Sequence, residues 1–288
     1  MIDKCQVNLF LIGAMKAGTT TLQGYLTRHP EIYMSPIKEP YFFSSKFDRG
    51  VKWYNSLFEE SRDVLYRGEA STEYTKLPLF PEVVDRISTH TKNARFIYLL
   101  RDPVKRSISQ YWWESHHSFE WQDMLQAIQN SPLYLDYSYY AMQLRPYIDR
   151  FGMNNIYVLT LENLIADTVQ ELEKLRVWLN LTQPFEVSNK LEHRNPGPSD
   201  INQVKCGWLF GLIRGTPLWN WAKAVIPTGV TRSVRASLKR PVTKDNSQVE
   251  KTIEFLRPIQ ITQTEELKKI LGRDFPEWHT LYNTKQNL

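Results

Sequence analysis

The stretch Asn8–Leu26, NLFLIGAMKAGTTTLQGYL, decides how the rest of the chain is interpreted. Its first part, Leu9–Ile12 with Val7 before it, is an apolar-rich run of strand length, and Gly13 ends the run. A loop with Lys16–Gly18 follows, and apolar residues then recur at helical spacing over Leu22–Leu26. A strand, a glycine-bearing loop and a helix together point backbone N–H groups and a helix N-terminus at an anion. We therefore expect a phosphate site in this loop.

The order of residues in the loop separates it from a Walker A motif. A Walker A loop places its lysine directly after the last glycine and before Ser or Thr. Here Lys16 comes two residues before Gly18, and Thr19 follows the glycine. This order weakens an assignment as a nucleotide kinase or GTPase. An ordinary strand-to-helix turn with a solvated lysine is the plainer alternative.

Length and composition indicate a globular α/β protein. The chain has 288 residues, of which 42% are hydrophobic and 23% charged, so it can bury a core in one large domain or two smaller ones. The formal net charge is +5 and the pI about 9.0. A mild positive excess suits an anionic ligand or a nucleic acid and does not choose between them.

Cysteine usage and apolar runs point away from metal sites and membranes. The two cysteines, Cys5 and Cys206, form neither a metal-binding spacing nor a disulfide framework. The start of the sequence lacks the pattern of a signal peptide. The longest apolar region, Cys206–Pro227, is interrupted by charged residues and proline. We expect a soluble, cytoplasmic protein that needs no metal.

A second strong signal is Arg95–Pro103, RFIYLLRDP. The continuous apolar run Phe96–Leu100 is typical of a strand buried on both faces of a parallel sheet. Asp102–Pro103 suits the start of a helix, with the aspartate as N-cap. Ser109 would lie about two turns into that helix. Arg101 then stands at the carboxyl end of a central strand, which is where open α/β sheets bind ligands.

A proline-punctuated segment, Ser35–Phe43, is too irregular for a strand or a helix. Its aromatic end, Tyr41–Phe43, is expected to anchor it to the core. Glu39 lies in this anchored loop and would reach the first loop if both lie at one edge of the sheet. A solvated surface charge is the alternative for this glutamate.

The remaining pattern alternates strands with helices. Further strands are predicted at 64–66 and 155–160, and helices at 51–58, 78–87, 104–115, 119–129, 139–151, 168–181, 249–256 and 264–271, the last ended by Gly272. This alternation predicts an α/β fold, a three-layer sandwich with a central parallel sheet flanked by helices. We expect one domain over 1–288. The region 195–244 is interpreted as a lid or substrate-facing insert, with a surface helix pair as the alternative.

Taken together, the motifs resemble the sulfotransferases that use 3′-phosphoadenosine 5′-phosphosulfate (PAPS), whose fold is P-loop-like. Gly13–Thr20 is similar to their loop for the 5′-phosphosulfate. Leu100–Pro103 with Ser109 is similar to their 3′-phosphate motif. Lys38–Phe43 resembles the KExxFF segment of the heparan-sulfate-type branch, and Leu271–Trp278 resembles the LGRDF-x-x-W of bacterial and heparan-sulfate-type members.

The resemblance implies a role for each matching residue. Lys16 would contact the oxygen that bridges sulfate and 5′-phosphate, and Glu39 would take the proton of the acceptor. The scheme needs no metal. The residues implied to bind the co-substrate are Lys16, Ala17, Gly18, Thr19, Thr20, Thr21, Arg101 and Ser109.

The acceptor is less defined than the donor. Glycan-acting members often carry Glu-Lys-Thr-Pro where this chain has Glu69–Thr72. The missing lysine and the lack of an export signal favour a small cytosolic acceptor with a hydroxyl or amine, such as a natural product. Glu69 and Glu73 would suit a cationic alkaloid, with solvation as the alternative for at least one of them. We expect no nucleic-acid or membrane partner, and the oligomeric state stays open.

Three other functions compete with this interpretation. A glycan O-sulfotransferase is the nearest alternative. A P-loop kinase of unusual loop order would turn over ATP with magnesium. A nucleic-acid-binding module would use the basic, tryptophan-containing region Trp208–Arg240 and lose affinity steeply with salt.

Overall fold

The computed structural model describes residues 4–61, 63–117, 120, 122–187, 201–204, 239–242 and 246–282. Of the expected lid at 195–244, only two strands are described, β6 (Ile201–Val204) and β7 (Lys239–Val242), which pair in antiparallel fashion. The rest of that region lies outside the described residues, so the lid stays a prediction.

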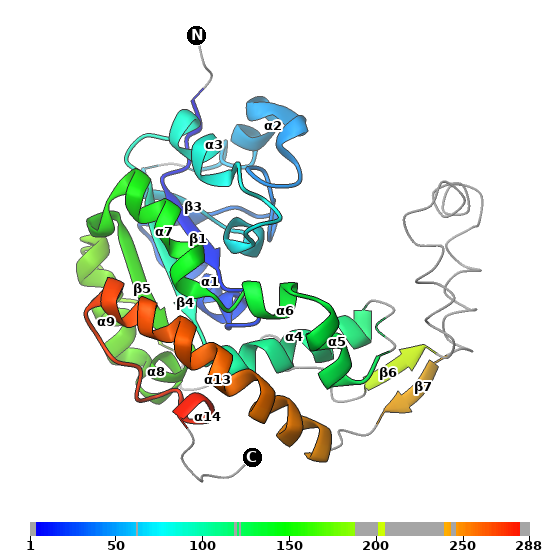
Figure 1. Ribbon diagram of the computed structural model, residues 1–288. Coiled ribbons are helices and arrows are strands. Elements are labelled where there is room, and N and C mark those ends of the chain that lie inside the picture. Colours follow the sequence, from blue (N-terminus) through cyan, green and yellow to red (C-terminus); the bar gives the residue numbers. More distant parts are fainter. Residues whose placement is uncertain are drawn as a thin grey trace, which may run out of the picture.

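The core of the molecule is a five-stranded sheet in the order β2-β3-β1-β4-β5, and every described pairing in it is parallel (Figure 1). Because β1 lies between β3 and β4, the carboxyl ends of these three strands meet at one edge of the sheet. The strands are β1 (Leu9–Gly13), β2 (Ile32–Met34), β3 (Tyr66–Ala70), β4 (Arg95–Leu100) and β5 (Ile156–Thr160).

The two central strands are apolar because both of their faces are covered. All five residues of β1 are buried, as are all residues of β4 after Arg95. Aromatic rings join the strands across the core, with Phe10 stacked on Phe96 at a centroid separation of 5.5 Å. The buried runs that the sequence predicted are therefore strands of the sheet centre.

Helices flank the sheet and complete the predicted α/β sandwich, which is confirmed (Figure 1). Helices α3, α7 and α13 pack in series, while α8 and α9 lie against β5. The helices are α1 (Thr19–Arg28), α2 (Gly50–Ser56), α3 (Val83–His90), α4 (Pro103–His117), α5 (Met124–Asn130), α6 (Leu133–Asp136), α7 (Tyr140–Phe151), α8 (Leu161–Ala166), α9 (Thr168–Leu179), α13 (Asn246–Leu271) and α14 (His279–Tyr282), with short 3-10 turns at η1 (Phe47–Arg49), η2 (Thr72–Thr75) and η3 (Met153–Asn155).

Several predicted boundaries were wrong. The second predicted strand, 64–66, begins two residues later and runs through Glu69 to Ala70. The three-residue strand β2 and the short helices α6 and α8 were not predicted, because segments of three to six residues carry too little periodicity. Two predicted helices, 78–87 and 119–129, begin five residues later than expected, at Val83 and Met124.

The two predicted C-terminal helices form one continuous helix, α13, which passes through Pro258. Its buried residues continue at helical spacing on both sides of the proline, from Ile253 to Leu267. Packing of this face therefore outweighs the lost N–H of the proline. The predicted cap at Gly272 is confirmed, since its φ is +62° and its N–H donates to the carbonyl of Lys268 at 2.8 Å.

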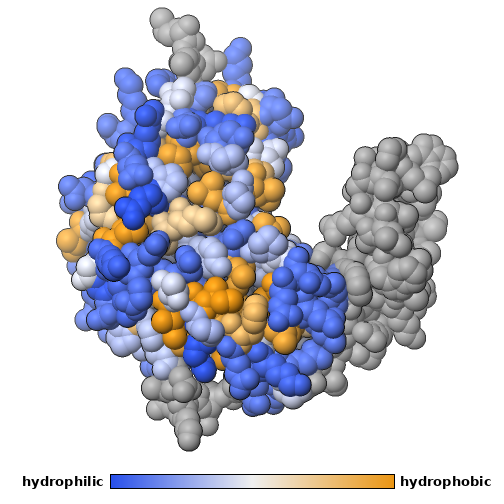
Figure 2. Space-filling model, viewed as in Figure 1, coloured by the Kyte–Doolittle hydropathy of each residue, from blue (hydrophilic) through white to orange (hydrophobic). Residues whose placement is uncertain are grey.

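On the face drawn in Figure 2, hydrophilic residues predominate among the described residues, and apolar residues gather in patches between them. Exposed large apolar side chains include Leu79, in the turn before α3, and Val169 on α9. Scattered exposure of this kind is ordinary for a folded domain.

Candidate functional site

A cavity of about 1130 Å³ opens at the edge where β3, β1 and β4 end. Residues from the loops after these strands line it, among them Lys16, Thr72 and Arg101, together with Ser109 on α4 and Ile253 on α13. Ligand sites commonly span roughly 300–1,000 Å³, so this cavity can hold a nucleotide and a second molecule.

The first loop presents a helix N-terminus to the cavity. Lys16 and Gly18 have φ angles of +68° and +89°, and α1 begins directly after them at Thr19. Gly18 occupies the N-cap position and has no side chain with which to cap the helix. Gly18 and the three threonines Thr19–Thr21 line the cavity. The first turn of α1 therefore faces the space where an anion is expected.

Ala17 differs from its neighbours in the loop. Its side chain is fully buried, and it is not among the residues that line the cavity. Its N–H donates to the carbonyl of Ala14 at 3.1 Å, so this group already has a partner within the turn. Ala17 therefore packs inside the turn, and its predicted contact with the co-substrate stays a prediction.

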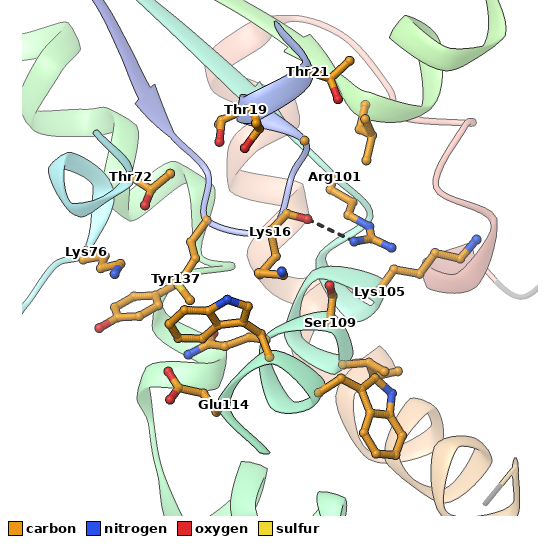
Figure 3. A pocket seen from close by; sticks show the side chains of 18 of the residues that line it. Lys16, Thr19, Thr21, Thr72, Lys76, Arg101, Lys105, Ser109, Glu114 and Tyr137 are labelled. Carbon is orange, nitrogen blue, oxygen red and sulfur yellow. Dashed lines mark hydrogen bonds between the residues drawn. The ribbon is translucent and has the colours of Figure 1, made fainter. Parts of the chain in front are cut away.

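Arg101 joins the second motif to the first. Its Nη1 donates to the backbone oxygen of Lys16 at 3.0 Å, as Figure 3 shows. The hydroxyl of Tyr140 donates to the carbonyl of Arg101 at 2.7 Å and fixes the backbone behind it. Ser109 lies on the same side of the cavity, one helix turn beyond Lys105 (Figure 3). The predicted residues Lys16, Arg101 and Ser109 are therefore brought together.

The start of α4 is held firmly, which fixes the place of Ser109. Asp102 Oδ1 accepts from the N–H groups of Val104 at 3.0 Å and Lys105 at 3.1 Å, so the predicted N-cap is confirmed. Its Oδ2 accepts from the N–H groups of Thr280 and Leu281 at 3.0 and 3.1 Å, which ties α14 to the same point. No pattern in the sequence predicted this second attachment.

Positive charge dominates the cavity. Six basic side chains and two carboxylates line it among the described residues: Lys16, Lys38, Lys46, Lys76, Arg101 and Lys105 against Glu39 and Glu114. Burial lowers the pKa of the Lys16 ammonium, and the neighbouring Arg101 and Lys38 lower it further, while Glu39 opposes them. An anionic ligand would relieve this mutual repulsion.

Glu39 lies at the cavity, as predicted, and is not a fully solvated surface charge. Burial raises the pKa of its carboxyl. The positive charges of Lys38 and Lys76 and a hydrogen bond with Thr72 act in the opposite direction. A carboxyl with a raised pKa is a stronger base than an ordinary carboxylate, which suits the role of general base.

Several residues of the cavity were not predicted from the sequence. Lys38 Nζ donates to the hydroxyl of Thr20 at 2.6 Å and so links the Glu39 loop to the first loop. Lys76 Nζ lies 5.5 Å from the ring centroid of Tyr137 (Figure 3). Lys38 stands inside a recognised motif and could have been proposed from it. Lys76 and Tyr137 belong to irregular segments that no sequence pattern connects.

Glu69 and Glu73 do not lie where the sequence suggested. Glu69 is fully buried in the core, and neither glutamate lines the cavity. Burial raises the pKa of the Glu69 carboxyl to about 7, although hydrogen bonds from Ser71, Tyr74 and Tyr54 lower it. Glu73 accepts hydrogen bonds from Ser44 and Ser45, each at 2.7 Å. Because β3 extends through Glu69, this side chain points into the protein, and the expected contact of Glu69 with the acceptor was wrong. Glu73 is partly exposed, so solvation of at least one of the two glutamates is not contradicted.

Comparison with known proteins identifies the family. A family model described as a sulfotransferase domain matches residues 6–195, more than half of the chain. The chain belongs to the sulfotransferase family. The resemblance drawn from the motifs is therefore confirmed, and with it the prediction of a transferase.

Individual relatives support the same family. A membrane-associated sulfotransferase, kil1, of Dictyostelium discoideum is 41% identical over 120 residues, which are 41% of this chain and 24% of that protein. Heparan sulfate glucosamine 3-O-sulfotransferase 3A1 of Mus musculus is 27% identical over 180 residues, 59% of this chain and 45% of the mouse protein. The chain thus matches less than half the length of either relative.

A solved structure supports the fold. The crystal structure of a sulfotransferase from Alicyclobacillus acidocaldarius superposes with a TM-score of 0.67 at 21% sequence identity, covering 96% of this chain and 99% of that one. Within the described residues of the present chain, no helix is both long and apolar enough to cross a membrane.

Proposed function

We propose that this sulfotransferase moves the sulfuryl group of PAPS to a hydroxyl or amine of an acceptor and releases 3′-phosphoadenosine 5′-phosphate. The observation that carries the proposal is the joining of Lys16 and Arg101 at one cavity, through the bond from Arg101 to the Lys16 carbonyl. A cofactor with phosphate at both ends needs two cationic groups at a fixed separation. The helix N-terminus beside Lys16 supplies further donors.

The residues divide the reaction between them. The acceptor oxygen or nitrogen attacks sulfur while the bond from sulfur to the bridging oxygen of the 5′-phosphate breaks. Lys16 stabilises the negative charge that grows on that oxygen, and Glu39 takes the acceptor proton. Thr19–Thr21 hold the 5′-phosphate, and Arg101 with Ser109 holds the 3′-phosphate. The scheme assigns no step to a metal.

The acceptor is proposed to be a small molecule. Around Glu39 the cavity carries Lys38, Lys46 and Lys76, and it also offers aromatic surface at Tyr41 and Tyr137. These cations support a neutral or negatively charged acceptor over the cationic alkaloid that the sequence suggested. We also propose a cytoplasmic location.

A second candidate is a glycan O-sulfotransferase. The mouse relative is named for heparan sulfate, and the three lysines around Glu39 would suit an anionic glycan. The position of the lysine in the glycan branch's Glu-Lys-Thr-Pro is occupied by Ala70 in this chain, which weighs against that acceptor.

The proposal is tested by incubating the full chain with PAPS and a mixed panel of phenols, alcohols, amines and heparan-type oligosaccharides. Mass spectrometry should find an added sulfate on at least one compound, with release of 3′-phosphoadenosine 5′-phosphate. Parallel reactions with ATP, with and without magnesium, test the kinase alternative. Release of ADP, together with no sulfate transfer, would contradict the proposal.

A further inference from the structure

A buried carboxylate stands behind the loop that carries Glu39. Glu69, at the end of β3, is fully buried and accepts three hydroxyl hydrogen bonds. Tyr54 and Tyr74 both donate to its Oε1, the former at 2.7 Å. Ser71 donates to its Oε2 at 2.6 Å. Each of the three hydroxyls therefore uses its proton in a hydrogen bond to this carboxylate.

Two of the three hydroxyls reach on to the loop backbone. Ser71 Oγ accepts from the N–H of Tyr41 at 3.1 Å, and the Tyr74 hydroxyl accepts from the N–H of Phe43 at 3.2 Å. A hydroxyl has a single proton. Because Ser71 and Tyr74 use that proton to donate a hydrogen bond to Glu69, their oxygen lone pairs are left to accept from the N–H groups of the loop.

The loop needs such support because its backbone is strained. Glu39 and Tyr41 have φ angles of +52° and +54°, in the left-handed region that residues other than glycine seldom adopt. Such conformations persist when the surroundings fix them. Arg86 adds to the hold from α3, donating to the carbonyls of Phe43 at 3.1 Å and Ser44 at 3.0 Å.

We infer that Glu69 is a positioning residue for Glu39, acting through the hydroxyls of Ser71 and Tyr74 on the backbone of the Glu39 loop. The carboxylate orients both hydroxyls, the hydroxyls hold the N–H groups two and four residues beyond Glu39, and the loop then aims Glu39 at the acceptor. Ser71 also precedes Thr72, which lines the cavity and bonds to Glu39. This inference rests on the proposed role of Glu39 as base.

The chain offers a matched set of variants. Ser71→Ala and Tyr74→Phe each remove one link between Glu69 and the loop. Tyr54→Phe removes the third hydroxyl from the same carboxylate. Within the described residues that hydroxyl donates to Glu69 and does not bond to the loop backbone, so this variant reports the cost of disturbing the buried carboxylate alone. Both Tyr→Phe variants keep their ring packing, which for Tyr54 is a stack on Phe42 at 4.3 Å.

The readouts are kcat, the Kd of 3′-phosphoadenosine 5′-phosphate, and hydrogen exchange at the backbone N–H groups of Tyr41 and Phe43. We expect Ser71→Ala and Tyr74→Phe to lower kcat about tenfold or more while nucleotide affinity stays within about twofold, because a misplaced base costs rate without touching the nucleotide site. Exchange at the N–H that has lost its hydroxyl should accelerate. Tyr54→Phe should change neither kcat nor the exchange rates at Tyr41 and Phe43. In a Glu39→Gln background, the Ser71 and Tyr74 substitutions should no longer alter the residual rate.

Two results would overturn the inference: an unchanged kcat in both link variants, or an equal loss in Tyr54→Phe. A failure of the proposed function is recognised separately, in the unmodified chain. If the unmodified chain transfers no sulfate and does not bind the nucleotide, the proposed function fails. The exchange rates at Tyr41 and Phe43 then decide on their own whether the Glu69 hydroxyls hold the loop: exchange faster in the link variants than in Tyr54→Phe supports it, and equal rates overturn it.

Discussion

The Nη1 of Arg101 lies 3.0 Å from the backbone oxygen of Lys16 and donates a hydrogen bond to it (Figure 3). One residue follows β4 and the other follows β1, which are neighbouring strands. The bond therefore holds the Arg101 guanidinium against the loop that carries Lys16, although the two residues are 85 positions apart in the sequence. It also fixes the carbonyl of a residue whose own φ is +68°.

Replacement of Lys16 by alanine should abolish most turnover and leave the fold intact. The side chain lines the cavity and is absent from the buried core, so the free energy of unfolding should change little. Loss of one group that stabilises the leaving oxygen should lower kcat by about 10²–10³-fold. Steady-state kinetics and thermal melting check this. Lys174→Ala is the control, because Lys174 pairs with Glu171 on α9 away from the cavity. Near-normal kcat in Lys16→Ala would remove Lys16 from the reaction.

The role of Arg101 should be visible in how much the 3′-phosphate contributes to nucleotide affinity. The unmodified chain is expected to bind 3′-phosphoadenosine 5′-phosphate more tightly than 5′-AMP, which lacks that phosphate. Arg101→Ala should reduce the ratio of the two affinities by about 10- to 100-fold, the worth of a charge-assisted hydrogen bond. Ser109→Ala should reduce it by only about fivefold, because its hydroxyl carries no charge. Calorimetry with both nucleotides gives the ratio. An affinity loss that is equal for both nucleotides would contradict the assignment.

Glu39 should appear in the pH dependence of the rate. Burial raises its pKa above the ordinary 4.5, and the base works only when deprotonated. The rate should therefore be full above the raised pKa and fall as the pH is lowered through it. Glu39→Gln should lose turnover, and the weak residual rate should no longer show this acid limb. Binding of 3′-phosphoadenosine 5′-phosphate should persist in that variant, and full activity would refute the role of Glu39.

The sequence was sufficient for the parts of the site that follow long buried strands. The apolar runs of β1 and β4 predicted two central strands, and parallel pairing then required Lys16 and Arg101 to meet at one edge. The motifs around Glu39 and Ser109 placed those residues correctly at the same cavity.

Residues in irregular segments could not be predicted in the same way. Lys76 follows a 3-10 turn and Tyr137 follows a four-residue helix, so their approach depends on tertiary packing alone. Glu69 was misplaced because nothing local distinguishes a glutamate at the end of a strand from one in the loop after it. Its three hydroxyl partners come from positions as far as 15 residues away.

Gly18 should be intolerant of alanine for two separable reasons. Its φ of +89° is costly for any residue with a Cβ, and a Cβ built there would lie 2.7 Å from Cδ1 of Leu161. Gly272 has a φ of +62° with open space around it, so Gly272→Ala measures backbone strain alone. We expect Gly272→Ala to lower the free energy of unfolding by about 1–2 kcal/mol, and Gly18→Ala to lower it by more.

The difference in the free energy of unfolding lost by Gly18→Ala and by Gly272→Ala should disappear when the side chain of Leu161 is shortened. In a Leu161→Ala background the added Cβ has room, so Gly18→Ala should then cost about as much as Gly272→Ala, about 1–2 kcal/mol. Urea unfolding of the four combinations at positions 18 and 161, with Gly272→Ala beside them, measures both contributions. An excess that persists without the leucine side chain would mean that the backbone of the loop, and not its contact with α8, forbids a side chain at this point. That result would place the whole requirement for glycine in the left-handed turn that opens the N-terminus of α1 toward the cavity.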